Sequence, residues 1–230
     1  MKKKIVVLTG AGISAESGIQ TFRDAGGLWE GHDVMEVASP EGWHKNQDLV
    51  QQFYNERRRA IKNAKPNKAH LVLAELEDYF DVTIITQNID NLHEQAGSKK
   101  IVHLHGELLK ARSSKFENLV YDWTEDITRE DKCEKGFQLR PHIVWFGEAV
   151  PMMPFASAIA AQADIMVVVG TSLVVYPAAS LAYHTDDNVP VYLVDKQKPP
   201  MYDRPNVHYI TENATTGTEK LKQILIEKYG

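Results

Sequence analysis

The 230-residue sequence contains a single cysteine, Cys133. One cysteine excludes an intramolecular disulfide framework, a four-cysteine zinc site and a C-x-x-C redox pair. Long apolar runs are also missing: the best one has Ile165–Val169 as its core, far below the roughly 20 residues that span a bilayer. The opening MKKKIVVLTG is charged, but its apolar stretch before Thr9 is too short for an export signal. We therefore expect a cytoplasmic protein with no membrane partner, which folds by packing alone.

Positive charge is scarce as well. The sequence has 26 Lys+Arg against 31 Asp+Glu, a formal net charge of −5. A nonspecific nucleic-acid binder needs a positive surface to displace counterions from phosphates, so we expect no nucleic-acid partner. Apolar residues make up 43% and charged residues 25%, which is typical of a soluble globular protein and excludes a disordered one.

Short apolar runs, each followed by small or polar residues, predict the strands. They are Ile5–Leu8, Val82–Ile85, Ile165–Val169 and Val191–Val194. Continuous runs of this length suit strands of a parallel sheet that is buried on both faces. Helical periodicity lies between them, over Leu49–Ile61, Lys68–Tyr79 and Thr218–Glu227. The alternation predicts an α/β fold with a Rossmann-like, doubly wound parallel sheet.

Two stretches interrupt this alternation. Asp24 to Trp43 is rich in glycine, aspartate and aromatic residues, and Ala111 to Gln138 is polar with a lone Trp123. We interpret the chain as one domain, residues 1–230, with insertions at approximately 24–65 and 111–139 that form a small module. We expect one insertion to be helical and the other irregular.

The first predicted strand leads into Gly10-Ala11-Gly12-Ile13-Ser14-Ala15, a G-x-G-x-x-A turn. The first glycine permits a tight turn, the second lets the backbone approach a pyrophosphate, and the small alanine lets the next helix pack closely. That helix would direct its free N–H groups at phosphates. A dehydrogenase would place an acidic ribose-binding residue about 20 residues further on, after a second strand. Phe22-Arg23-Asp24 and a glycine-rich loop occupy that interval, which disfavours hydride transfer.

Polar side chains follow the second predicted strand, in Thr86-Gln87-Asn88-Ile89-Asp90. The carboxyl ends of strands in open α/β sheets bind ligands, so amide and carboxylate groups there are well placed for a site. Asn88 or Asp90 would serve equally well as the N-cap of a helix through Leu92 and Ala96.

His103 and His105 alternate along a further predicted strand and so share one of its faces. They could be a metal pair, although no further ligands occur at a recognisable spacing. One of them could instead be a general base, because neutral histidine titrates near physiological pH. Structural histidines are the third interpretation, and the residues alone leave the choice open.

Taken together, six segments resemble the sirtuin family of NAD-dependent protein-lysine deacylases. They occur in family order over nearly the whole chain: GAGIS at 10–14, ESGIQTFR at 16–23, TQNID at 86–90 with LHEQAG after it, HLHGE at 103–107, RPHIVWFGE at 140–148 and VVVGTSL at 167–173. A single motif of this kind is weak evidence, whereas six in order are a strong signal.

The resemblance implies NAD as the cofactor, bound along the strand ends. The residues that it implies for this role are Gly10, Ala11, Gly12, Ser14, Glu16, Phe22, Arg23, Trp29, Gln87, Asn88, Ile89, Asp90, Gly170, Thr171, Ser172, Asp195 and Ala214. Relatives usually carry asparagine where this chain has Asp195. A carboxylate also accepts hydrogen bonds from ribose hydroxyls, so we expect NAD binding to persist.

The resemblance also implies catalytic roles for Asn88, Asp90 and His105. The acyl-lysine oxygen would attack C1′ of the nicotinamide ribose and expel nicotinamide. His105 would then act as general base on a ribose hydroxyl, whose oxygen attacks the resulting imidate, and water would release lysine and 2′-O-acyl-ADP-ribose. The partner is an acylated-lysine protein or peptide. The strand segment of the family against which the peptide adds as an extra strand is matched by Val144, Trp145, Phe146, Gly147 and Glu148. We expect a monomer.

Ala38, Tyr54 and Arg57 resemble the residues of the sirtuin branch that removes succinyl and malonyl groups. Tyr54 and Arg57 are spaced i, i+3 and so share one helix face. A phenol and a guanidinium that converge there would bind a terminal carboxylate, and the small Ala38 would leave room for the longer acyl chain. Without the resemblance, Arg57-Arg58-Arg59 is more simply a solvated basic face.

The chain departs from the family pattern in one respect. Many sirtuins hold a zinc ribbon with four cysteines between HGE and RPHIVWFGE, but here that interval has Ser113-Ser114 and the lone Cys133. A structural zinc ion needs about four good ligands, so we predict no metal and a segment held by packing, with Trp123 as an anchor.

Two other functions use the same residues. One is protein mono-ADP-ribosyl transfer, with the same C1′ electrophile and a different nucleophile. The other is a non-catalytic NAD-binding sensor, which the retained Asn88, Asp90 and His105 disfavour most.

Overall fold

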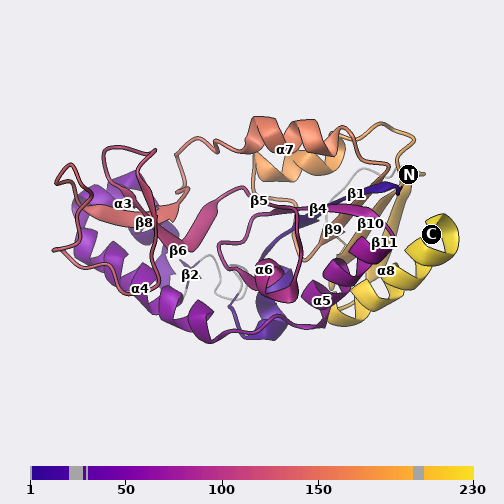
Figure 1. Ribbon diagram of the computed structural model, residues 1–230, viewed down its shortest axis with the longest axis horizontal. Helices are drawn as coiled ribbons and strands as arrows, with labels where there is room; N and C mark the ends of the chain where they lie inside the picture. Colours follow the sequence, from indigo (N-terminus) through magenta and orange to yellow (C-terminus); the bar gives the residue numbers. More distant parts are fainter. Residues whose placement is uncertain (1, 21–27, 30, 199–204) are drawn as a thin grey trace.

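The computed structural model describes residues 2–20, 28–29, 31–198 and 205–230 (Figure 1). Six parallel strands form its main sheet, in the order β11-β10-β9-β1-β4-β5. The strands are β1 (Lys4–Thr9), β4 (Asp81–Thr86), β5 (Ile101–His103), β9 (Ile165–Val169), β10 (Val191–Asp195) and β11 (Val207–Thr211). The predicted Rossmann-like parallel sheet is confirmed, and β11 is a strand that the sequence patterns missed.

Helices cover both faces of this sheet, as its uninterrupted apolar strands require. Alternate residues of β1 face opposite sides: Ile5 and Val7 belong to one core, whereas Val6 and Leu8 belong to the other. The first core includes residues of α5 (Lys68–Glu75), η2 (Leu76–Asp78) and α8 (Ala214–Tyr229); the second includes α7 (Met153–Ala160) and η3 (Ala178–Tyr183). The sheet is therefore doubly wound.

The order of the strands reverses at β1. From β1 the chain continues to β4 and β5 on one side, and later to β9, β10 and β11 on the other. The carboxyl ends of β1, β4 and β9 thus meet where open α/β sheets bind their ligands. The short helices α1 (Ala11–Ser14), η1 (Ala15–Ser17) and α6 (Leu92–Ala96) begin next to this point.

A smaller module lies at the left end of the long axis in Figure 1, and the main sheet lies toward the right. It contains α2 (Val34–Val37), α3 (Pro40–Lys45), α4 (Gln47–Asn63), the short pair β2 (Leu28–Trp29) and β3 (His32–Asp33), and an antiparallel sheet. That sheet has the order β7-β6-β8, with β6 (Gly106–Ser113), β7 (Val120–Asp122) and β8 (Leu139–Ile143). The expected helical insertion is present. The second insertion is irregular over most of its length, with strands only at its two ends and at β7.

Polar side chains of α4 hold this second insertion in place. Gln51 Nε2 donates to the carbonyl of Leu139 at 2.7 Å, and Arg58 Nε donates to the carbonyl of Leu108 at 3.0 Å. Asn55 makes paired hydrogen bonds of 2.9 Å, donating to the carbonyl of Ile127 and accepting from its N–H. Buried polar groups need such partners, so one helix face replaces solvent for three separate stretches of backbone.

A small apolar cluster lies within the same insertion. Ala111, Ile127, Cys133 and Leu139 form its buried part, and Trp123 packs against it from a half-buried position. Ile127 is only 1% exposed and is the better anchor, because its backbone also binds Asn55. Within the described ranges, no helix has both the length and the apolar character needed to cross a bilayer.

Candidate active site

A cleft of about 1130 Å³ opens at the carboxyl ends of β1, β4 and β9 and extends to the small module. Most of the residues singled out from the sequence line it: Gly10, Ala11, Gly12, Ser14, Trp29, Ala38, Tyr54, Arg57, Gln87, Asn88, Ile89, Asp90, His105, Val144, Trp145, Phe146, Gly147, Glu148, Gly170, Thr171, Ser172, Asp195 and Ala214. The fold thus brings segments from the whole length of the chain to one cavity.

Among the singled-out residues that the structure describes, Glu16 does not line the cleft. Glu16 accepts hydrogen bonds from the N–H and hydroxyl of Thr215, at 3.2 and 2.9 Å, and so connects η1 to α8. Phe22 and Arg23 lie outside the described residues.

Other lining residues were missed by the sequence reasoning, among them Ile19, Gln20, Tyr176 and Lys196. Ile19 and Gln20 belong to a segment whose family motif was already visible. Lys196 directly follows Asp195, so strand-end position was the available signal for it.

The glycines of the first loop are needed for a contact between two loops. The N–H of Gly12 donates to the carbonyl of Gly170 at 2.8 Å, and a Cβ on Gly12 would lie 2.7 Å from the Gly170 Cα. Gly170 has a φ of +63°, and a Cβ there would lie 2.3 Å from the Ile13 nitrogen. The expected helix starts at this loop, but α1 covers only Ala11–Ser14. These loops therefore present backbone atoms without side chains to the cleft.

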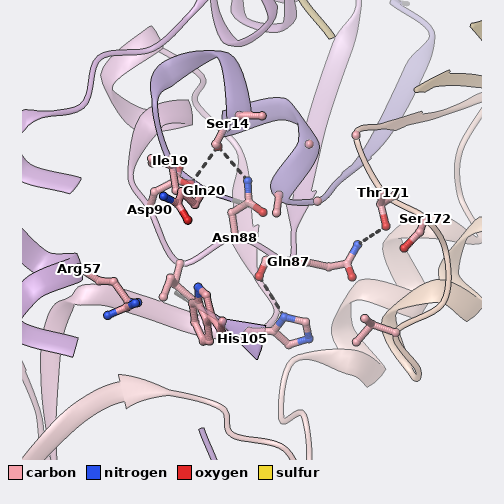
Figure 2. A pocket seen from close by; sticks show the side chains of 18 of the residues that line it. Ser14, Ile19, Gln20, Arg57, Gln87, Asn88, Asp90, His105, Thr171 and Ser172 are labelled. Carbon is pink, nitrogen blue, oxygen red and sulfur yellow. Dashed lines mark hydrogen bonds between the residues drawn. The ribbon is translucent and has the colours of Figure 1, made fainter. Parts of the chain in front are cut away.

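Ser14 connects the two polar side chains that follow β4 (Figure 2). Its hydroxyl donates to Asp90 Oδ2 at 3.0 Å and accepts from Asn88 Nδ2 at 3.0 Å. Asp90 Oδ1 accepts from the N–H of Leu92, the first residue of α6. The N-cap of that helix is Asn91, so the interpretation of Asn88 or Asp90 as the N-cap is wrong. Burial raises the pKa of Asp90, against the opposing effect of the Leu92 and Ser14 hydrogen bonds.

His105 has the geometry of a neutral base. Its Nδ1 lies 3.0 Å from the carbonyl oxygen of Gln87. A carbonyl only accepts, so Nδ1 carries the hydrogen and Nε2 keeps a lone pair. Burial lowers the pKa of His105, and the Gln87 carbonyl offsets this only in part. The imidazole is therefore able to take a proton at neutral pH.

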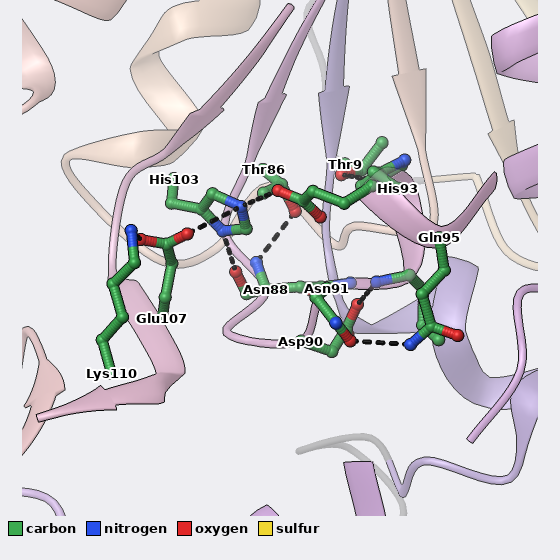
Figure 3. A network of polar contacts seen from close by, with 12 residues as sticks. Thr9, Thr86, Asn88, Asp90, Asn91, His93, Gln95, His103, Glu107 and Lys110 are labelled. Carbon is green, nitrogen blue, oxygen red and sulfur yellow. Dashed lines mark hydrogen bonds and ion pairs between the residues drawn. The ribbon is translucent and has the colours of Figure 1, made fainter. Parts of the chain in front are cut away.

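His103 has the opposite environment, although it is only two residues away (Figure 3). Its Nδ1 lies 3.2 Å from the carbonyl of Asn88, and its Nε2 lies 2.7 Å from a carboxylate oxygen of Glu94. Both nitrogens thus face acceptors, which fits the doubly protonated ring. Burial disfavours that charge, but Glu94 and then Glu107 outweigh burial and raise the pKa of His103. The charged ring supports the loop that carries Asn88.

His103 and His105 do not come together as a pair of metal ligands in the described part of the chain. In the described part of the chain, one group of potential metal ligands comes together, Glu94, His103 and Glu107, with ligand atoms within 4.8 Å of one another. His105 is not part of it. Glu94 already binds His103, and Glu107 pairs with Lys110 at 2.5 Å, so the charges of this group are compensated by protein partners.

The other end of the cleft is formed by α4 and the small module. Tyr54 is fully buried there, and Arg57 projects into the cavity from the side opposite Thr171 and Ser172 (Figure 2). The Arg57 guanidinium lies 3.2 Å from the centre of the Phe53 ring, and its Nη1 donates to the Phe53 carbonyl at 2.6 Å. These contacts fix the direction of the cation.

The three consecutive arginines of α4 have different environments. Arg57 lines the cleft, Arg58 is fully buried, and Arg59 is exposed and pairs with Asp126 at 3.3 Å. The alternative of a solvated basic face therefore describes Arg59 alone.

The segment from Val144 to Glu148 follows β8 as a turn and is not itself a strand. Glu148 closes the turn: its carboxylate accepts from the N–H of Trp145 at 2.8 Å and from Arg140 Nη1 at 2.7 Å. The N–H of Phe146 donates to the carbonyl of Ala38 at 2.9 Å, which joins the turn to the helical insertion. The expectation of a strand at this position is corrected accordingly.

The fold and the cleft together define a Rossmann-like α/β protein whose ligand site lies between its sheet and a smaller module. The chain belongs to the Sir2 family, whose model matches residues 10–177.

Curated relatives and solved structures resemble the chain over nearly its full length. It is 54% identical over 225 residues to an NAD-dependent protein deacylase of Helicobacter pylori strain J99, covering 98% of this chain and 96% of the relative. It is 50% identical over 230 residues to an NAD-dependent protein deacylase of Bacteroides thetaiotaomicron, covering 97% and 98%. A Sir2 homologue–NAD complex superposes with a TM-score of 0.88 at 36% identity, covering 100% of this chain and 91% of that one.

Proposed function

We propose that this protein is an NAD-dependent protein-lysine deacylase that prefers succinyl- and malonyl-lysine to acetyl-lysine. The observation that carries the acyl preference is that Tyr54 and Arg57 line the same cleft as His105. Membership of the Sir2 family supports the deacylase activity itself, as do relatives at 50–54% identity that are named NAD-dependent protein deacylases.

The residues of the cleft suit NAD. The contact of Gly12 with Gly170 leaves a backbone cradle that any Cβ would fill, which is the surface a pyrophosphate needs. Asn88 and Asp90 add an amide and a nearly buried carboxyl group, partners for the nicotinamide amide and the adjoining ribose hydroxyls. When bound, NAD supplies the C1′ electrophile and nicotinamide as the leaving group.

His105 is the base in this proposal. Its Nδ1–H is held by the Gln87 carbonyl, so Nε2 is left to take the proton of a ribose hydroxyl. The lowered pKa keeps the ring neutral at physiological pH, which general-base catalysis requires. Asp90 and Asn88 are held by Ser14 and orient the bound groups rather than transfer protons.

Two donors at the other end of the cleft select the acyl group. A succinyl or malonyl chain ends in a carboxylate, which accepts charge-assisted hydrogen bonds from the guanidinium of Arg57 and a hydrogen bond from the phenol of Tyr54. The buried Ala38 has a small side chain, which leaves room for the longer chain. Acetyl-lysine lacks the carboxylate and gains neither interaction.

The substrate in this proposal is an acylated-lysine protein or peptide that lies along the turn from Val144 to Glu148. Phe146 is 40% exposed there, although its backbone is fixed by Ala38, so the turn offers both an apolar surface and a rigid edge. A related Sir2 structure, 30% identical with a TM-score of 0.81 over 99% of this chain and 94% of that one, contains a deacetylated p53 peptide. One chain carries every group invoked, and we propose a monomeric, cytoplasmic enzyme.

The test is a comparison of matched succinyl-, malonyl- and acetyl-lysine peptides with NAD, in the wild type and in Arg57→Met. We expect the variant to lose about 10- to 100-fold in kcat/KM for the succinyl peptide, because hydrogen bonds to charged groups contribute about 1.5–3 kcal/mol. Acetyl turnover should be unchanged. Arg59→Met is the matched control, since it removes an exposed arginine of the same helix.

Three outcomes would overturn the proposal. Acetyl turnover far above succinyl turnover, with no effect of Arg57→Met, would refute the acyl preference. Labelled ADP-ribose attached to a protein would indicate ADP-ribosyl transfer. NAD binding without release of nicotinamide on any acyl peptide would indicate a sensor.

A further inference from the structure

We propose that Trp145 is a positioning residue for acyl selection, because it fixes the hydroxyl group of Tyr54 as a hydrogen-bond donor for an acidic acyl chain. The inference rests on the proposed function and concerns how the same site recognises a carboxylate.

The contact that carries the inference joins two buried side chains. Trp145 Nε1 lies 3.1 Å from the Tyr54 hydroxyl oxygen, and the two residues are 2% and 0% exposed. An indole N–H can only donate, so the phenol oxygen accepts in this contact. The phenol hydrogen prefers the plane of its ring, which allows two directions. The Trp145 N–H occupies one of them, and the hydroxyl hydrogen takes the other.

A fixed direction matters for a carboxylate and is irrelevant for a methyl group. A hydroxyl group that is free to rotate must lose that freedom when it donates to a carboxylate, whereas a hydroxyl already fixed in the donating direction does not. With its lone pair engaged by Trp145, the Tyr54 hydroxyl is left to donate. Burial raises the pKa of Tyr54, so the phenol keeps its proton even with an anion beside it. Both Tyr54 and Trp145 line the cleft, together with Arg57.

Further contacts hold Trp145 in this orientation. The Arg140 guanidinium lies 3.2 Å from the centre of the Trp145 ring, and the Trp43 ring centre lies 5.6 Å away. Arg140 is held in turn by Glu148 and by the Ile143 carbonyl, at 2.7 and 2.9 Å. The same Glu148 accepts the backbone N–H of Trp145. The ion pair thus fixes both the backbone and the ring of the tryptophan.

The test is Trp145→Phe, which keeps an aromatic ring and removes the N–H. We expect KM for a succinyl-lysine peptide to rise about 5-fold, the equivalent of one neutral hydrogen bond of about 1 kcal/mol, with kcat little changed. Any rise in KM for the matched acetyl-lysine peptide should be smaller, because only the succinyl chain uses the Tyr54 hydroxyl. Trp123→Phe is the matched control, because it removes an indole N–H that donates to the Asp126 carbonyl in the separate apolar cluster around Ile127.

Tyr54→Phe completes a double-mutant cycle. If Trp145 acts through the Tyr54 hydroxyl, then the double variant should be no worse than Tyr54→Phe alone for the succinyl peptide. Should Trp145→Phe fold poorly, benzothienylalanine at position 145 removes the N–H while keeping the shape of the indole, and the same increase in KM is expected.

The possible results separate the two proposals. Equal losses for the succinyl and acetyl peptides would show that Trp145 has only a structural role, and additive effects in the cycle would show that it does not act through Tyr54. Either result overturns the inference and leaves the acyl preference intact. A wild-type enzyme without preference for the succinyl peptide would refute the proposed function, and the inference with it.

Discussion

The two ends of the cleft differ in what they present to a ligand: one presents backbone and the other presents side chains. At the end proposed to bind the dinucleotide, Gly12 and Gly170 bring backbone against backbone, and side chains are excluded by contact distances. At the end proposed to bind the acyl group, Tyr54, Arg57 and Trp145 meet as side chains whose directions are set by aromatic and ionic neighbours. A backbone site tolerates almost no substitution and serves every substrate alike. A side-chain site can be altered one residue at a time, and each change affects one class of acyl group.

The largest loss of activity is expected at His105, which lies between the two ends of the cleft (Figure 2). We expect His105→Ala to lower kcat by about 10²- to 10⁴-fold with every acyl peptide, the range typical of a lost general base. His103→Gln is the informative comparison, because His103 acts only through the Asn88 carbonyl and should cost much less. Full activity of His105→Ala in a single-turnover assay would remove the residue from its role.

A change at the backbone end should affect all substrates equally. In Gly12→Ala the new Cβ would lie 2.7 Å from backbone atoms of Gly170, so one of the two loops must move. Overpacking of this kind costs about 1–3 kcal/mol, and we expect KM for NAD to rise about 10-fold or more. The ratio of succinyl to acetyl turnover should not change; a shift in that ratio would contradict the proposed separation of the two ends.

The stability of the small module should depend on the hydrogen bonds that α4 makes with its backbone, on the helix side that does not line the cleft. Asn55→Ala removes two hydrogen bonds to Ile127 and leaves its backbone groups buried without partners. We expect the free energy of unfolding to fall by about 3 kcal/mol, measured by denaturant titration. Gln52→Ala on the exposed side of the same helix is the control and should have almost no effect. Equal losses in the two variants would argue against the tethering role.

The pH dependence should report the base between the two ends. Because burial lowers the pKa of His105, the fall of kcat/KM on the acid side should have its midpoint below the ordinary histidine value of about 6.5. The sign follows from the role: the base works when neutral and is lost on protonation. An acid limb with its midpoint at or above that value would contradict the assignment.

Removal of metal ions is the change for which we expect no effect. The insertion between β6 and β8 has one cysteine and is held by α4 and a small apolar cluster. We therefore expect no stoichiometric zinc by elemental analysis and no loss of activity or melting temperature with a strong chelator. Loss of activity that zinc restores would mean that this end of the molecule, too, depends on a ligand.

The contrast between the two ends also explains how much of the molecule could be predicted from its sequence. A strand that is buried on both faces must be apolar throughout, and Ile165–Val169, at most 2% exposed, therefore stands out. The glycine loop stands out because its G-x-G-x-x-A pattern is continuous in the sequence, although the residue that requires Gly12 to lack a side chain is the distant Gly170. Both belong to the backbone-built part of the protein.

The small module could not be predicted in the same way. The pairing of β6 with β8 contains a register shift between Glu107 and Ala111, which removes the regular alternation that marks a strand. The hydrogen bonds that join this sheet to α4 come from Gln51 and Arg58, which are far away in the sequence. The contact of Trp145 with Tyr54 spans 91 residues, and the opposite environments of His103 and His105 depend on Glu94. Local patterns carry no record of such contacts.

Helix α4 faces two ways, and this has a consequence for how the protein can change over time. Tyr54 and Arg57 line the cleft, whereas Gln51, Asn55 and Arg58 reach the backbone of the small module. Residues that we propose to select the acyl group thus alternate along one helix with residues that bind the backbone of the small module, and the two sets have separate partners. Selection could retune which acyl group is removed by substitutions on the cleft-facing side while the architecture stays intact. Substrate choice and structural integrity are encoded in one stretch of sequence but are free to evolve apart.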